Sequence, residues 1–116
     1  MKLAIALMLM VSVIGVAAEN LKEQIKFGNE AAKQGLWNEA RFRWQKVIDA
    51  DPSNGSAHNN IGVALEREGK IEQAVVEYRL AVKLLPDNSY ARKNLQRSEE
   101  LLKNATGEQK KVEAKK

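Results

Sequence analysis

Residues 35–40 read GLWNEA, and further along the chain residues 69–74 read GKIEQA. Each copy starts with a glycine and ends with an alanine, with a bulky apolar residue and an acidic residue between them. Glycine just past a helix end can take the left-handed conformation that reverses the chain, so both segments predict a tight turn between two helices. Their spacing along the chain predicts a repeated helical hairpin.

A shift of 34 residues, the distance from Gly35 to Gly69, also aligns residues at helix boundaries and inside helices. Asparagine favours helix N-termini because its side chain accepts a hydrogen bond from a free backbone N–H, and proline cannot continue a helix. A glycine inside a helix costs about 1 kcal/mol relative to alanine, so a glycine kept in both copies predicts a close approach of two helices. The aligned sets are Asn20, Asn54 and Asn88, then Gly28 and Gly62, and lastly Pro52 and Pro86.

Apolar residues at steps of three and four predict helices rather than strands. The spacing predicts five of them, over residues 20–34, 38–50, 54–68, 72–85 and 88–104. Residues 105–116 lack an apolar face and are rich in lysine. A segment of this kind has little apolar surface to bury, so we expect a disordered basic tail.

Two consecutive units of this pattern resemble the tetratricopeptide repeat (TPR), a family built from helix–turn–helix units of the same spacing. The resemblance rests on the two turn segments, on the Phe27-Gly28 and Ile61-Gly62 steps, and on closing turns at Pro52 and Pro86. It covers residues 20 to about 103 and implies an all-α fold, the α–α superhelix of a TPR solenoid. The TPR domain would span residues 19–104, with repeat one at 21–54, repeat two at 55–88 and a capping helix at 89–104.

The segment 1–18 has the layout of a secretory signal peptide. Lys2 precedes an apolar run from Leu3 to Val16, and small residues lead to Ala18. We expect cleavage after Ala18 and export, most simply to a bacterial periplasm. The alternative is an uncleaved membrane anchor, although the run is shorter than the roughly 20 apolar residues that a spanning helix needs.

Composition limits the chemistry that the chain can perform. It has no cysteine, which excludes a disulfide framework and a thiolate nucleophile. A formal net charge of +4 is too mild to indicate a nucleic-acid partner. No metal-ligand cluster or phosphate loop is present, so we expect no catalytic residues, no metal and no cofactor. The single histidine, His58, falls where the repeat has a packing residue, and we expect a structural role.

The resemblance also implies a concave groove, lined by the first helix of each unit, that holds a peptide or a partner helix. Carried over by register, its lining would include Lys22, Ile25, Asn29 and Lys33, then Ser56, Asn59, Val63 and Glu66, and finally Tyr90, Lys93 and Arg97. A chaperone-binding subgroup of the family grips a terminal carboxylate with asparagines and cations. Here Ile25, Tyr90 and Asn94 stand where those cations should be, so that activity is not expected.

Phe42 and Val76 occupy the same position in the two repeats, on the second helices, where the family usually carries exposed polar residues. We hypothesise that they form an outer-face contact for self-association or a partner; the alternative is that Phe42 fills a gap beside Trp44 or Trp37.

The leading functional prediction is an adaptor that binds a protein or peptide in the bacterial envelope. The alternative is a self-assembling structural repeat protein of the periplasm, a homo-oligomer. Any membrane contact is expected only through the basic tail. Repeats of this kind need about three units for stability, so a chain with two and a half of them is expected to have modest stability.

Overall fold

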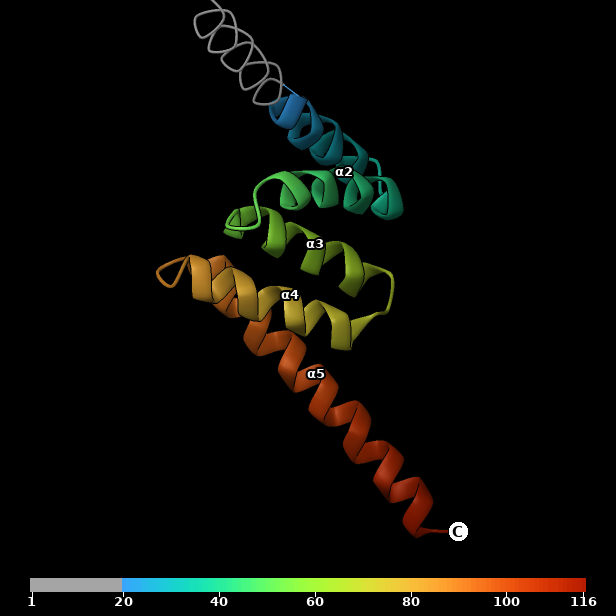
Figure 1. The fold of residues 1–116 in the computed structure, drawn as a ribbon. Coiled ribbons are helices and arrows are strands. Elements are labelled where there is room, and N and C mark those ends of the chain that lie inside the picture. The colour runs from blue at the N-terminus through green and yellow to red at the C-terminus, as the bar shows by residue number, and fades with distance from the viewer. Residues whose placement is uncertain (1–19) are drawn as a thin grey trace, which may run out of the picture.

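The computed structural model describes residues 20–116. The expected signal peptide and its cleavage site lie outside these described residues. The helices are residues 20–33, α2 (Trp37–Ala50), α3 (Gly55–Arg67), α4 (Ile71–Leu84) and α5 (Ser89–Ala114), and residues 20–116 contain no strand. Consecutive helices lie side by side and alternate in direction, as Figure 1 shows. The all-α prediction and the order of the five helices are confirmed.

The two repeats end their first helices in the same way. Gly35 and Gly69 have φ angles of 75° and 80°. In each turn the residue after the glycine donates back to the helix, Leu36 N to Ala31 O at 2.9 Å and Lys70 N to Leu65 O at 2.8 Å. This is the hydrogen bond that satisfies carbonyl groups at a helix C-terminus, and it confirms the predicted turns.

Two of the three predicted asparagine caps are formed. The Oδ1 atoms of Asn54 and Asn88 accept hydrogen bonds from Ala57 N and Ala91 N, each at 3.0 Å. Asn20 differs, because it is already part of its helix and its Oδ1 accepts from the Gln24 side chain at 3.1 Å. The repeat register predicted that Asn20 caps the first helix, and this prediction is wrong.

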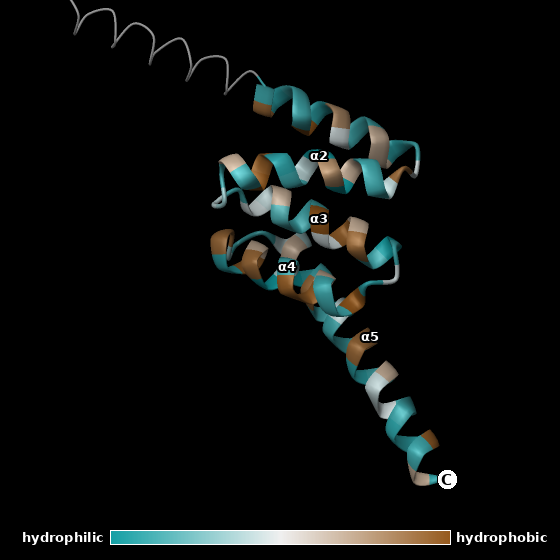
Figure 2. Ribbon diagram, turned by 45° about the vertical axis from the view of Figure 1, so that its right-hand side comes forward, coloured by the Kyte–Doolittle hydropathy of each residue, from teal (hydrophilic) through white to brown (hydrophobic). Residues whose placement is uncertain are grey.

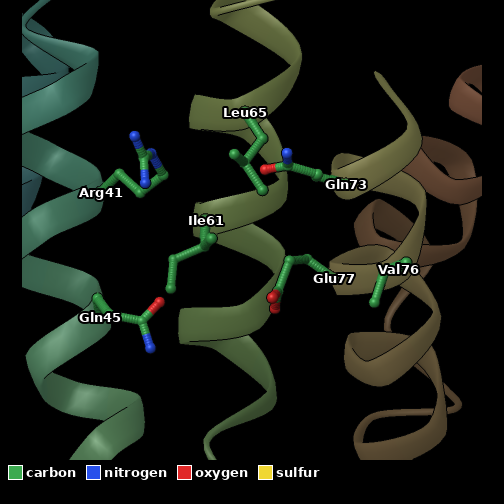
Figure 3. A pocket seen from close by; sticks show the side chains of 7 residues that line it. All are labelled: Arg41, Gln45, Ile61, Leu65, Gln73, Val76 and Glu77. Atoms are coloured by element: carbon green, nitrogen blue, oxygen red, sulfur yellow. The ribbon is translucent and has the colours of Figure 1, made fainter. Parts of the chain in front are cut away.

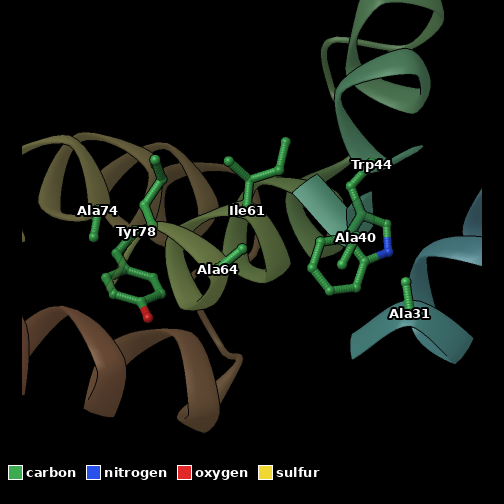
Figure 4. Packing of buried hydrophobic residues seen from close by; sticks show 8 residues of the cluster. Ala31, Ala40, Trp44, Ile61, Ala64, Ala74 and Tyr78 are labelled. Atoms are coloured by element: carbon green, nitrogen blue, oxygen red, sulfur yellow. The ribbon is translucent and has the colours of Figure 1, made fainter. Parts of the chain in front are cut away.

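The core follows the line where the helices of each hairpin meet (Figure 4). A Cβ added to Gly28 would lie 2.5 Å from Trp44 Nε1, and one added to Gly62 would lie 2.5 Å from Tyr78 Cε1. The two glycines therefore make room for the aromatic rings of the opposing helices. The predicted close approach of helices is confirmed in both repeats.

The prediction of a disordered tail at residues 105–116 is wrong, because α5 continues to Ala114. This last part of the helix extends past the stack of the other helices and is mostly hydrophilic (Figure 2). Its Glu, Gln, Lys and Ala residues have high intrinsic helix propensity. Propagating an existing helix is also easier than nucleating a new one, so the segment needs no apolar face of its own.

None of the helices within residues 20–116 combines the length and the apolar character that a bilayer crossing requires.

Candidate functional site

An open depression lies on the face of the stack that the helix 20–33, α3 and α5 present; we call this the concave face. The depression has a volume of about 560 Å³ between α3 and α5. Its lining mixes apolar and polar side chains, from Val63, Glu66, Arg67, Ile71, Asn94, Arg97 and Leu101. Such a lining can take an apolar side chain and hydrogen-bond the backbone beside it.

Glu66 is the most strongly held side chain of the depression. Arg97 donates to it twice, from Nε at 3.0 Å and from Nη2 at 2.8 Å, and the Tyr78 hydroxyl donates to Oε2 at 2.7 Å. The Arg97 hydrogen bonds hold the pKa of Glu66 below its ordinary value, although partial burial acts in the opposite direction. Burial and the nearby carboxylate raise the pKa of Tyr78, so its hydroxyl remains a donor.

A second polar contact joins α3 to α5 on the same face. Asn94 Nδ2 donates to Asn59 Oδ1 at 3.0 Å. The Arg67 guanidinium lies 5.4 Å from the centroid of the Trp37 ring, which holds this cation beside the depression. Fixed groups of this kind lose little conformational entropy when a ligand binds.

The structure brings together only part of the predicted lining. Val63, Glu66 and Arg97 line the depression, and Asn59 adjoins it through Asn94. The predicted residues that do not line it are Lys22, Ile25, Asn29, Lys33, Ser56, Tyr90 and Lys93. Asn29 accepts a hydrogen bond from Trp44 Nε1 at 3.3 Å, and Lys33 pairs with Glu30 at 3.3 Å.

Four lining residues were not predicted: Arg67, Ile71, Asn94 and Leu101. The family resemblance places Asn94 only at a cation position of the chaperone clamp. The repeat offset could have indicated Ile71, since it aligns with Trp37 and both side chains are partly buried on the hairpin turn. The presence of Leu101 and Arg67 in the lining depends on how α5 crosses α3, and no local sequence pattern predicts that crossing.

His58 has the structural role that its register predicted. Its ring is buried, with Nδ1 at 2.7 Å from Glu77 Oε2 and Nε2 at 2.8 Å from the Pro52 carbonyl oxygen. The histidine therefore ties the turn between the repeats to α4. In residues 20–116, no three His, Cys, Asp or Glu side chains gather closely enough to hold a metal ion.

Phe42 and Val76 are both exposed on the opposite face, which α2 and α4 present; we call this the convex face. The Phe42 side chain is 53% exposed and lies outside the hydrophobic core cluster. The alternative that Phe42 fills a gap beside Trp44 or Trp37 is therefore wrong. Its role in a contact between molecules stays a prediction.

No family model and no curated protein matches this chain. Among solved structures, the TPR2B domain of yeast Sti1, in a pHsp70 complex, superimposes with a TM-score of 0.70 and 17% identity, over 77% of this chain and 71% of that one.

Two other TPR domains match with a TM-score of 0.43. The Arabidopsis OM64 TPR domain is 20% identical, over 71% of this chain and 96% of that domain. The first TPR of Spaghetti (RPAP3), bound to an HSP90 peptide, is 22% identical, over 72% and 94%. The fold conclusion rests on the Sti1 domain alone: this chain has the same all-α superhelical repeat fold.

Proposed function

From the TPR fold of this chain, we propose that it is a non-catalytic adaptor that binds a segment of another protein on its concave face. The depression between α3 and α5 carries the proposal. It offers apolar contact from Val63, Ile71 and Leu101, beside polar groups that the fold already holds in place. A site that is ordered before binding favours recognition because fewer side chains must be immobilised.

The partner segment would differ from the one that a carboxylate clamp selects. The Sti1 domain was solved in a pHsp70 complex, which supports peptide binding by this fold. In this chain, however, the charge of Arg97 is already matched by Glu66, with two hydrogen bonds between them. We therefore expect the partner to contribute an apolar anchor rather than a terminal carboxylate.

We also propose that the adaptor works after export, in the bacterial envelope. The apolar run of residues 3–16 and the small residues up to Ala18 support a signal peptide. Cell fractionation, followed by N-terminal sequencing of the purified protein, tests this. A chain that starts at Glu19 in the periplasmic fraction is expected, and an intact Met1 in the cytoplasm would contradict it.

A photo-crosslinking amino acid at Leu101, which lines the depression, tests the binding site. The same amino acid at Lys83, an exposed position of α4 that does not line the depression, is the control. We expect a partner to crosslink from position 101 and not from position 83. The crosslinked segment is then synthesised and titrated against the wild type and the variants.

Leu101→Asp should weaken binding of that segment by about tenfold or more, because it places a charge in the apolar part of the depression. Leu36→Asp, in the turn before α2, should leave the affinity unchanged. Equal crosslinking from both positions, or equal affinity of the Leu101 variant and the wild type, would rule out the concave site.

A further inference from the structure

The convex face carries a groove of its own between α2 and α4. It has a volume of about 250 Å³, and its floor consists of Ile61 and Leu65 from α3, which are 2% and 5% exposed. Arg41 and Gln45 form the α2 wall, and Gln73, Val76 and Glu77 form the α4 wall, as Figure 3 shows. The proposed partner site on the concave face uses none of these side chains.

Phe42 is carried by α2, the helix of one groove wall, one residue after Arg41, and its own side chain does not line the groove. Its side chain is 53% exposed, and two cations lie near its ring. Lys46 Nζ is 4.8 Å and Arg43 Cζ is 5.8 Å from the ring centroid. A half-exposed phenylalanine held by two cations is an apolar projection with a positive rim.

The apolar surface continues along α4. Val76, Leu80 and Leu84 are all exposed and recur every four residues, so they form one stripe along the helix. Three large apolar residues in line on an outward helix face make a contiguous apolar surface rather than scattered exposure. A contiguous surface of this kind marks an interaction site.

We propose that the occupant of this groove is Phe42 of a second copy of the chain, in a twofold dimer. The chain itself supplies both halves of the contact, an aromatic projection and an apolar-floored groove, on the same face. With both on one face, a twofold axis lets each copy insert its Phe42 into the other, and the assembly closes at two. The stripe on α4 would be covered in the same interface.

Charge also favours this pairing. The projection is flanked by Lys46, and the α4 wall of the groove carries Glu77. Arg43 is already paired with Glu39 at 2.7 Å, and Arg41 of the α2 wall is already paired with Glu68 at 3.1 Å. Glu77 uses Oε2 for His58, and among residues 20–116 no hydrogen bond engages its Oε1. Opposite charges at the edge of an apolar contact fix its orientation and reject mismatched partners.

Sedimentation velocity over a range of concentrations, on protein purified from cells that express the full chain, tests the dimer. The wild type should show a reversible monomer–dimer equilibrium. Phe42→Asp and Leu80→Asp should each raise the dissociation constant about 30-fold or more, the effect expected at the centre of an interface. Leu36→Asp is the matched control, since Leu36 is 52% exposed but lies in a turn, and its constant should change less than about threefold.

The absence of cysteine from the chain permits a second test of the geometry. A mixture of Lys46→Cys and Gln73→Cys proteins should form a disulfide between copies, because this places one cysteine beside Phe42 and the other on the groove wall. A mixture of Tyr90→Cys and Gln73→Cys should not, because Tyr90 lies on α5. Circular dichroism of each variant confirms that it is folded.

A wild type that remains monomeric at every concentration would overturn the proposal. So would a folded Phe42→Asp variant that dimerises like the wild type, or crosslinking that is equal in the two mixtures. A partner protein, rather than a second copy, would be indicated if the wild type is monomeric and partner capture depends on Phe42. Leu101→Asp should leave the dimer intact, so failure of the concave site and failure of this interface are distinguishable.

Discussion

Gly62 shows how closely single residues determine this fold. A Cβ at this position would lie 2.5 Å from the Tyr78 ring, which is completely buried. We predict that Gly62→Ala destabilises the protein by about 1–3 kcal/mol, because overpacking outweighs the better helix propensity of alanine. Urea unfolding measures this. Gly107→Ala is the control, since its added Cβ would meet no atom within 4 Å apart from the neighbouring backbone of its own helix, and it should be neutral or stabilising.

Glu66 makes stability depend on acid pH. Because its folded pKa lies below the ordinary value of 4.5, its ionised form stabilises the fold above that pH. The stabilisation is lost as the pH falls through the folded pKa. We predict that Glu66→Gln weakens the fold by about 1 kcal/mol at pH 7 and flattens the decline in unfolding free energy below pH 4.5. An unchanged decline in the variant would assign the acid sensitivity to other carboxylates.

At the scale of elements, the last turns of α5 are expected to contribute little to the stability of the helix stack. Residues 105–116 are all exposed except the partly buried Gly107, and none of them belongs to the hydrophobic core, so removing them takes away no core residue. We predict that this truncation shifts the melting temperature by less than about 4 °C while it lowers the helical circular dichroism signal. A shift well beyond about 4 °C would mean that the end of α5 packs on the stack in solution.

The helix ends and the helix contacts differ in how well the sequence predicts them. Gly69 and Asn54 act through backbone groups a few residues away, so their chemistry is local and the repeat offset was enough to place them. The helical end of α5 could not be predicted from apolar spacing, because this segment has no apolar face and its helix depends on residue propensity and on continuing an existing helix. In the candidate site, the Arg97–Glu66 contact joins the capping helix to repeat two, and only the packing of α5 on α3 creates it.

At the scale of the whole molecule, the two ends of the stack are not equivalent. α5 covers α4, but within residues 20–116 no helix lies on the outer side of the helix 20–33. Phe27 and Ile61 occupy the same repeat position, and Phe27 is 48% exposed whereas Ile61 is 2% exposed. Stability in a repeat protein depends on contacts between neighbours, so the first helix has one stabilising contact fewer than α3.

This asymmetry predicts where the molecule opens first. Within the helix 20–33 only Gly28 and Ala31 are buried, whereas seven residues of α3 are buried. Backbone amides of residues 24–33 should therefore exchange with deuterium faster than those of α3, by about tenfold or more, because local opening of an end helix breaks fewer contacts. Hydrogen exchange followed by mass spectrometry measures both segments in one sample, with α4 as the internal reference. Equal protection of the first helix and α3 would instead mean that the stack opens as one cooperative unit, as a partner or a second helix covering Phe27 would cause.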